Sequence, residues 1–444
     1  MRPKRSQNEE AQGQLWKTDL EKIIDLGHPM VKMAEGIDWG RLDAAFGESY
    51  VEGKGRPAIP TRLMVALHYI KFTFDLSDDE VVQGWRENVY WQWLSGMRWF
   101  EHGAPIDPSS MSRWRRRIEE TGAMELLKET IAAGLEMKLI KRKQLEVVNV
   151  DTTVQEKNVR YPTDARLYHR SIEKLTRQAK KDGVRLKRTY KRVSKLALFM
   201  QSRYAHTRKP AKAAAQTRKL RTLLGRVRRE IERGVANPSG KMRELLEVTG
   251  RIEAQERGDK RKVYSVHEPH VECISKGKAH KKWEFGCKVS VVVSSRGGWI
   301  TGAQAFHGTP YDGHTLQGSL DRAAATAGVT PGEAHTDKGY RKHGYKGETQ
   351  VHVDKTRRGD TPKPLWKRMK RRAAVEPTIG HLKSDHRLDC NRLKGPEGDL
   401  LNIVFAAIGK NFAKLLRLLC ALIFRRLMGV TAPVPLTRPC PSFP

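Results

Sequence analysis

Acidic residues that follow apolar segments give this chain its clearest potential for chemistry. Asp151 comes directly after Val147, Val148 and Val150, whose alternation predicts a buried strand ending near the acid. An ionised carboxylate in a dry environment is costly unless it is paired or bound to a metal ion. Asp151 therefore either begins a turn before Thr152 or belongs to a site that other acids complete.

Two further acids occupy comparable positions. Asp337 ends a short strand predicted from Gly332, and Glu376 lies in a basic helix predicted to begin after Pro364. A mixed sheet can bring the ends of separate strands side by side, and a helix can pack against the same edge. We expect Asp151, Asp337 and Glu376 to converge there. Three carboxylates supply the oxygen ligands that Mg²⁺ or Mn²⁺ prefers, and two such ions about 4 Å apart can promote attack on a phosphodiester.

Two cations accompany Glu376. Arg372 lies four residues before it and Lys383 seven residues after it. On an ideal helix the three side chains fall within an arc of about 40°. That face would offer one acid to a metal and two cations to DNA phosphates, although Arg372 and Glu376 could equally form an ordinary surface pair. Pro377 disfavours helix at Glu376 and can kink the segment.

The overall charge indicates a polyanionic partner. The formal net charge is +34 and the pI is about 10.1, which favours nucleic acid, although a structural basic protein would have a similar charge. Five cysteines at irregular spacing predict no disulfide framework, which favours a reducing cytoplasm. The N-terminus lacks the apolar core of a signal peptide, and charged residues interrupt the apolar segment 400–430 too often for a membrane span.

The predicted fold class is α/β, with a mixed α+β sheet and helical additions. Helical spacing begins at Ile59, Ser77 and Glu80 form a predicted capping box, and Asp107 with Pro108 starts a third helix that stops near Thr121 and Gly122. Alternating apolar residues predict a hairpin of two strands over 283–293 and 299–306, and helical spacing predicts helices over 314–327 and about 400–427. The predicted divisions are an N-terminal extension (1–50), a helical domain (51–142), a catalytic domain in two segments (143–165 and 263–428), a basic helical insertion (166–262) and a Pro-rich tail (429–444).

Two segments are candidates for contact with DNA. The third helix carries four arginines, and we expect them to contact phosphates in a helix-turn-helix arrangement, unless they form only the solvated face of a bundle. These residues are Arg113, Arg115, Arg116 and Arg117. The segment 166–262 is dominated by Lys and Arg, and we expect it to follow the DNA backbone rather than serve as a solvated insert.

Other candidates are weaker. Asp312 and His314 could line the site, but ordinary capping of the following helix is the preferred interpretation. Asp164 could replace Asp151, although no strand precedes it. The spacing of His267, His270 and Cys273 resembles a metal site but fits no zinc pattern, so a basic loop with a half-buried Cys273 is the preferred interpretation.

Several blocks together resemble a bacterial insertion-sequence DDE transposase, of the subclass with a Tyr-Arg-Glu-Lys signature around the last acid. The resemblance covers about residues 55–420. The blocks are Asp151-Thr-Thr-Val, Tyr161-Pro-Thr-Asp-Ala, Pro310-Tyr-Asp-Gly-His-Thr-Leu, Thr336-Asp-Lys-Gly-Tyr and Glu376-Pro-Thr-Ile-Gly-His-Leu-Lys-Ser-Asp-His-Arg.

The resemblance implies a ribonuclease-H-like catalytic domain in which Asp151, Asp337 and Glu376 bind two Mg²⁺ ions, for which Mn²⁺ can substitute. It implies that Arg372 and Lys383 are the cations of the signature. The signature Tyr would fall near Met369, where this chain lacks it.

The same resemblance implies that the protein binds terminal inverted repeats and target DNA, acts as a homodimer in the DNA complex, and works in the bacterial cytoplasm at the nucleoid. The alternatives are a catalytically silent DNA-binding protein derived from such an enzyme, and a divalent-metal DNA nuclease without strand transfer.

Overall fold

A computed structural model describes residues 17–47, 58–275, 281–354, 366 and 370–429 of the 444-residue chain. The chain divides into two compact units. The first combines Met1–Gln155 with Lys288–Pro444, and the second is Glu156–Cys287. The strands β1 (Val147–Glu156) and β3 (Trp283–Ser294) each run across the division between the units.

The N-terminal part of the first unit is helical. Its elements are the short helix η2 (Leu20–Lys22), α1 (Pro29–Gly36), α2 (Trp39–Gly47), α3 (Thr61–Thr73), α4 (Asp78–Glu87), α5 (Val89–Leu94) and α6 (Ser109–Glu136). The expectation of a polar N-terminal extension is wrong for residues 17–47. Met33 in α1 and Leu42 and Phe46 in α2 are buried, so both short helices contribute side chains to the core.

Local sequence signals explain the helix boundaries. Ser77 and Glu80 form the predicted capping box at the start of α4. Asp107 accepts the backbone N–H of Ser109 at 2.9 Å, where α6 begins. The predicted break in the arginine-rich helix lies at Glu119, whose positive φ of 52° interrupts α6.

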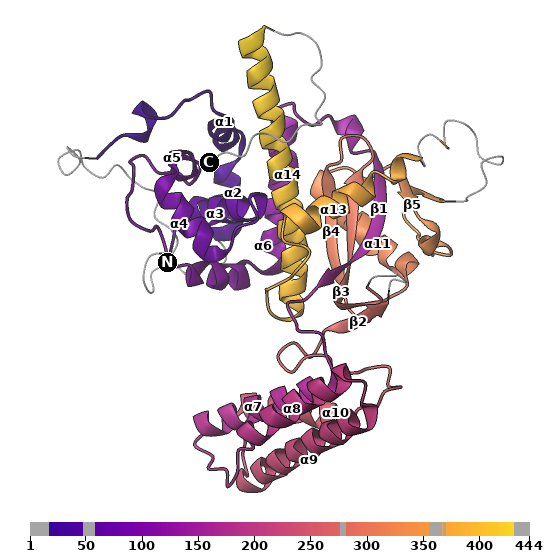
Figure 1. Cartoon of the computed structure of the whole chain (residues 1–444). Coiled ribbons are helices and arrows are strands. Elements are labelled where there is room, and N and C mark those ends of the chain that lie inside the picture. The colour runs from indigo at the N-terminus through magenta and orange to yellow at the C-terminus, as the bar shows by residue number, and fades with distance from the viewer. Residues whose placement is uncertain (1–16, 48–57, 276–280, 355–365, 367–369, 430–444) are drawn as a thin grey trace. The chain divides into compact units, whose positions relative to one another are not determined.

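The long helix α14 (Gly395–Met428) organises the first unit. It packs against α3 and α6 on one side and against strand β4 (Ile300–Phe306) on the other, as Figure 1 shows. The segment from Ile403 to Phe412 is buried almost throughout, which stabilises the contact between the helices and the sheet. Among the described residues, no helix is both long enough and apolar enough to span a bilayer.

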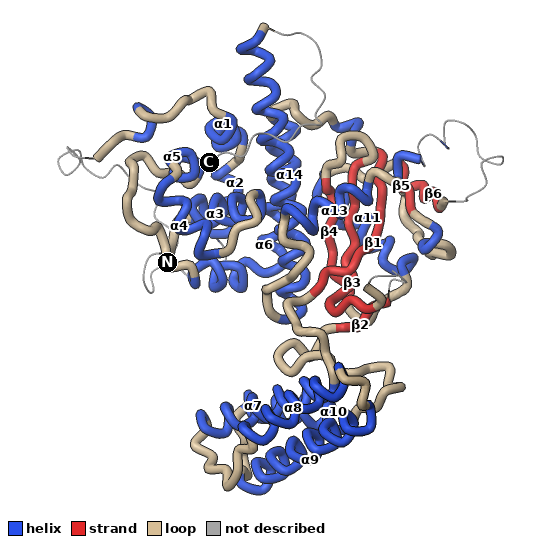
Figure 2. The backbone as a smooth tube through the Cα atoms, in the orientation of Figure 1, coloured by secondary structure: helices blue, strands red, loops and turns tan. Residues whose placement is uncertain are grey.

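The sheet is mixed, and its strand order is β2-β3-β1-β5-β6, with β4 paired to β3 (Figure 2). Strands β3 and β4 form the predicted antiparallel hairpin, while β5 (Glu333–Thr336) runs parallel to β1 and to β6 (Gln350–Val353). Helix α11 (Asp312–Ala327) packs on this sheet through Leu316 and Leu320. The strand β2 (Glu272–Ser275) lies in a segment interpreted from the sequence as a loop.

The second unit contains a helical bundle. Helices α7 (Asp164–Lys181), α8 (Lys191–His206), α9 (Pro210–Gly234) and α10 (Gly240–Ala254) share an apolar core that includes Ile172, Leu175, Leu224 and Ile252. Between residues 183 and 229 the sequence has 16 lysines and arginines and no acidic residue. The core burial shows why this strongly basic segment folds, and its charges lie mainly on the exposed faces of the helices.

Candidate active site

The parallel pairing of β1 with β5 brings two of the predicted acids together. Asn149 is aligned with His335, and continuing this register by two residues would set Asp151 level with Asp337. Strand β5 ends at Thr336, so Asp337 is the first residue beyond it, whereas β1 continues to Glu156. The expectation that Asp151 ends its own strand is therefore wrong, because it lies level with the end of the neighbouring strand.

Asp337 lies in a partly buried and negatively charged environment. Its carboxylate accepts the backbone N–H of Gly339 at 2.9 Å, which caps the short helix η4 (Lys338–Tyr340). Burial raises the pKa of Asp337, and the negative charges of Asp312 and Asp354 add to that shift, while Gly339 and Arg372 oppose it. Asp354 occupies the equivalent position after β6, and its N–H donates to the Thr336 carbonyl at 3.1 Å.

Asp312 joins these acids, although the sequence favoured a simple capping role. Its Oδ1 accepts the Thr152 hydroxyl at 2.8 Å and the Lys288 ammonium at 2.9 Å. A Cβ atom built on Gly339 would be 3.0 Å from both Asp312 Oδ2 and Asp337 Oδ1, so the two carboxylates border the same residue. Asp312 belongs to the motif block from Pro310 to Leu316, but the spacing of that block did not show that Asp312 would contact Thr152 on β1.

The environment of Tyr340 also shows that the acids gather in one place. Tyr340 is buried and is the last residue of η4, the short helix that follows β5. Burial raises the pKa of its phenol well above the ordinary value, and the charges of Asp151, Asp312 and Asp337 raise it further. Negative charge is therefore concentrated around this phenol from three separate segments of the chain.

Glu376 lies at the edge of this group rather than within it. It is on helix α13 (Val375–Asp385), its side chain is 67% exposed, and its Oε1 is 3.9 Å from Nη2 of Arg372. Arg372 and Glu376 do not share one helix as predicted, because a turn at 373–374 follows the helical residues 370–372 and α13 begins at Val375, with Pro377 in its first turn. Most of the basic helix expected before Glu376, with Met369, lies outside the described residues.

Arg372 connects the two parts of the site electrostatically. Its side chain is 17% exposed, it faces Glu376, and its positive charge lowers the pKa of Asp337. The neighbouring carbonyl of Arg371 accepts a 3.4 Å hydrogen bond from the Asn149 amide, which holds this turn against β1. Lys383 is half-buried on α13, about two turns beyond Glu376.

The carboxylates suit a hard divalent cation, although they do not form a closed ligand set. Within the ranges that the structure describes, no three His, Cys, Asp or Glu side chains are arranged to hold a metal ion. Asp151 lies on β1 and Asp337 directly follows the parallel strand β5, whereas Glu376 faces Arg372. Burial, and to a smaller extent the charges of Asp312 and Asp354, raise the pKa of Asp337, and carboxylate oxygens are the donors that Mg²⁺ and Mn²⁺ prefer.

The residues with a zinc-like spacing have protein partners instead. His267 Nδ1 lies 3.0 Å from the Ser265 hydroxyl, and His270 Nε2 lies 3.4 Å from Glu268. Cys273 forms a side-chain hydrogen bond with Tyr264. These contacts give each of the three residues a local structural role.

The four arginines of α6 do not share one role. Arg113, Arg116 and Arg117 are exposed, but Arg115 is only 3% exposed. Arg115 donates to both carboxylate oxygens of Asp78, at 2.9 and 2.6 Å. The structure thus corrects the prediction of DNA contact for Arg115, because its guanidinium is committed to an internal ion pair.

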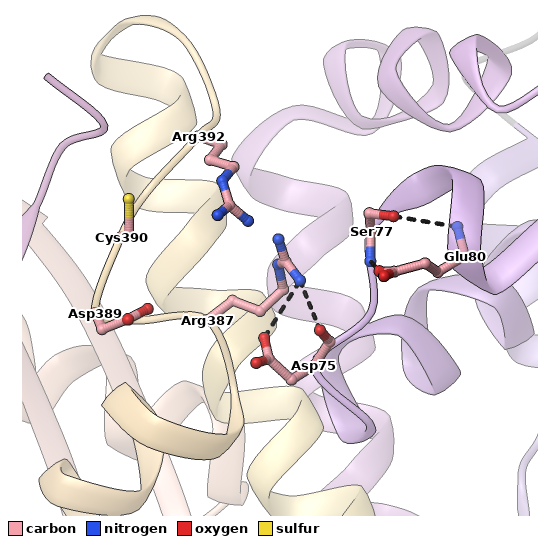
Figure 3. A pocket seen from close by; sticks show the side chains of 7 residues that line it. All are labelled: Asp75, Ser77, Glu80, Arg387, Asp389, Cys390 and Arg392. Atoms are coloured by element: carbon pink, nitrogen blue, oxygen red, sulfur yellow. Dashed lines mark hydrogen bonds and ion pairs between the residues drawn. The ribbon is translucent and has the colours of Figure 1, made fainter.

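A polar pocket joins the loop before α4 to the segment after α13 (Figure 3). Arg387 donates to the carbonyl oxygen and to Oδ1 of Asp75, at 2.7 and 3.2 Å. The pocket is lined by Asp75, Ser77, Glu80, Arg387, Asp389, Cys390 and Arg392. It contains both acids and cations, and the visible function of the Arg387–Asp75 pair is to fasten the end of α13 to the N-terminal helices.

Comparison with known proteins identifies two parts of the chain. Residues 18–117 match the family described as "Transposase domain (DUF772)", and residues 255–411 match "Transposase DDE domain". Asp337 and Glu376 lie inside the second match, whereas Asp151 lies outside both.

A curated relative also aligns with the chain. The "Uncharacterized protein ORF8 in nfe locus" of Rhizobium meliloti is 47% identical over 208 residues, which are 47% of this chain and 99% of the relative. No solved structure matches. The chain therefore contains two transposase domains, and the second of them is a DDE domain.

Proposed function

We propose that this protein is the transposase of an insertion sequence, and that it binds the terminal inverted repeats of its own element, cleaves DNA there and joins the ends to a target. The observation that carries the proposal is the parallel pairing of β1, which contains Asp151, with β5, which Asp337 directly follows. Arg372 and Glu376 lie at the edge of the same group.

Asp151, Asp337 and Glu376 are the proposed catalytic residues and metal ligands. When bound, two Mg²⁺ ions (or Mn²⁺) would polarise the phosphodiester and favour formation of the attacking hydroxide or 3′-alkoxide. Glu376 has to leave Arg372 and turn toward the two aspartates to complete the ligand set. The exposure of its side chain supports such a movement, because little packing holds it in place.

The proposed DNA contacts extend from the acids to the helical parts. Arg372 and Lys383 would hold phosphates beside the acids, while Arg113, Arg116 and Arg117 would contact phosphates of the end-binding domain. The basic helices α8 and α9 would follow the DNA backbone, since an acid-free segment with 16 cations is balanced most simply by a polyanion. The proposed active complex is a homodimer that holds inverted-repeat and target DNA at the bacterial nucleoid.

The test is a strand-transfer assay on DNA ends taken from the flanks of the gene. Asp151→Asn, Asp337→Asn and Glu376→Gln should each lose Mg²⁺-dependent cleavage and joining but retain binding to the ends. Asp321→Asn is the matched control, because this exposed aspartate of α11 lies outside the acid group.

Three outcomes would change the proposal. Full activity in any of the three active-site variants would remove that residue from the site. Cleavage by the wild-type protein without joining would indicate a nuclease. If the wild-type protein binds the DNA ends but neither cleaves nor joins them, it is a catalytically silent DNA-binding protein.

A further inference from the structure

A continuous set of hydrogen bonds connects Asp151 to a lysine on another strand. The backbone N–H of Thr152 donates to Asp151 Oδ1 at 2.8 Å, and the Thr152 hydroxyl donates to Asp312 Oδ1 at 2.8 Å. The ammonium of Lys288 donates to the same Oδ1 of Asp312 at 2.9 Å and to the Pro310 carbonyl oxygen at 2.6 Å. Thr152 therefore holds Asp151 through its backbone and is itself held through its side chain.

This set of contacts is sheltered from solvent. The side chains of Lys288 and Asp312 are 14% and 28% exposed, so their ion pair is screened less than a surface pair. Lys288 lies on β3, Thr152 on β1 and Asp312 at the start of α11. Three separate elements thus meet at one carboxylate, which limits how far the β1 backbone at Asp151 can move.

The ion pair with Lys288 also explains how Asp312 can lie near Asp337. Asp312 Oδ1 is occupied by two donors, while Oδ2 borders Gly339 opposite Asp337 Oδ1. Two carboxylates so close would repel each other, and Asp312 indeed contributes to the raised pKa of Asp337. Lys288 offsets part of this repulsion, so Asp312 can position Thr152 without adding a full uncompensated charge.

We propose that Lys288, Asp312 and Thr152 form a positioning group that fixes the orientation of the Asp151 carboxylate for a divalent cation. The proposal rests on the function proposed above, because it gives Asp151 the role of a metal ligand. Asp312 and Thr152 act through Asp151 and are positioning residues. Groups that orient a ligand commonly change metal affinity by about 10–100-fold when they are removed.

The test compares two substitutions of Thr152 in the full-length protein. Thr152→Val keeps the side-chain shape but removes the hydroxyl, and Thr152→Ser keeps the hydroxyl. Mn²⁺ binding is followed by the electron paramagnetic resonance signal of the unbound ion, and strand transfer is followed under single-turnover conditions. Thr301→Val is the matched control, since this buried β4 hydroxyl has no hydrogen-bond partner among the described residues.

Thr152→Val should weaken Mn²⁺ binding about 10-fold and slow strand transfer by a similar factor, with unchanged DNA affinity. Thr152→Ser should remain within about two-fold of the wild type for both quantities, as should Thr301→Val. Asp312→Ala should resemble Thr152→Val, and the double variant should be little worse than either single one, because both remove the hydrogen bond between Thr152 and Asp312.

Wild-type Mn²⁺ affinity in Thr152→Val would overturn the positioning role, and so would a Thr152→Ser variant that is equally defective. Asp151→Asn, measured in parallel, separates this result from failure of the proposed function. If Asp151→Asn binds Mn²⁺ and transfers strands normally, the assignment of the site itself is wrong. If only Asp151→Asn is defective, the site stands and the positioning group does not.

Discussion

Arg115 lies in the interior of the N-terminal helices and donates hydrogen bonds to both carboxylate oxygens of Asp78. Lys71 binds the same carboxylate at 2.6 Å, so one acid holds two buried cations. Burial by itself would raise the pKa of Asp78, but Arg115 and Lys71 outweigh it and keep that pKa well below its usual range. The cluster ties α3, α4 and α6 together.

Arg115→Ala is predicted to destabilise the first unit strongly. Each hydrogen bond to a charged group contributes about 1.5–3 kcal/mol, and the variant removes two of them while Lys71 still compensates the Asp78 carboxylate. Arg116→Ala, at the neighbouring exposed position, should change the free energy of unfolding by less than about 0.5 kcal/mol. Urea denaturation followed by tryptophan fluorescence measures both, and equal effects would contradict the internal role of Arg115.

The stability of the protein is predicted to fall as the pH decreases from about 6.5 toward 4. Burial lowers the pKa of His386 to about 4, although its Nδ1–H donates to the Phe72 carbonyl oxygen at 2.8 Å. In this window the unfolded chain gains a proton on His386 that the folded chain does not. The stabilisation that neutral His386 gives the folded protein is therefore fully present above about pH 6.5 and is lost as the pH falls to the pKa of His386 in the folded state.

His386→Gln tests that prediction. The variant should lower the slope of unfolding free energy against pH by about 1.4 kcal/mol per pH unit between about pH 6 and 4.5, the amount that one linked proton contributes. His381→Gln is the control, because His381 is exposed on the same helix. Parallel curves for wild type and His386→Gln would show that His386 is not linked to folding.

The basic helical unit is predicted to contact DNA phosphates through α8. Replacing Lys191 and Lys195, both exposed on α8, with glutamine should weaken DNA binding and reduce the slope of log affinity against log salt by about 1 for each phosphate interaction removed. The control replaces Lys22 and Lys138, which are exposed in the first unit, so that net charge falls equally. Filter binding at several salt concentrations measures the slopes, and identical slopes for both pairs would remove α8 from the interface.

Much of the catalytic sheet follows from local sequence patterns. Alternating apolar residues predicted β1, β3 and β4, and helical spacing predicted α11 and α14. The strand β2 was missed because its four residues carry no alternation. Helices α1 and α2 were missed because each has only about two turns, which is too short for a helical period to stand out in the sequence.

The site was predictable only in part. The positions of Asp151 and Asp337 after apolar runs indicated that they would meet, since parallel strands align their ends. The partners of individual side chains depended on tertiary contacts that spacing does not encode. Asp312 therefore looked like a helix cap, Arg115 looked like its exposed neighbours, and Glu376 was expected to reach a site that it only borders.

The most direct test of the proposed active site is strand transfer by Asp337→Asn beside Asp321→Asn under single-turnover conditions. We expect Asp337→Asn to bind the inverted-repeat ends with wild-type affinity and to lose joining by at least about 10³-fold, since it removes a proposed metal ligand. Asp321→Asn should be as active as the wild type. Joining by Asp337→Asn at a rate within about two-fold of the control would contradict the assignment of this acid group as the active site.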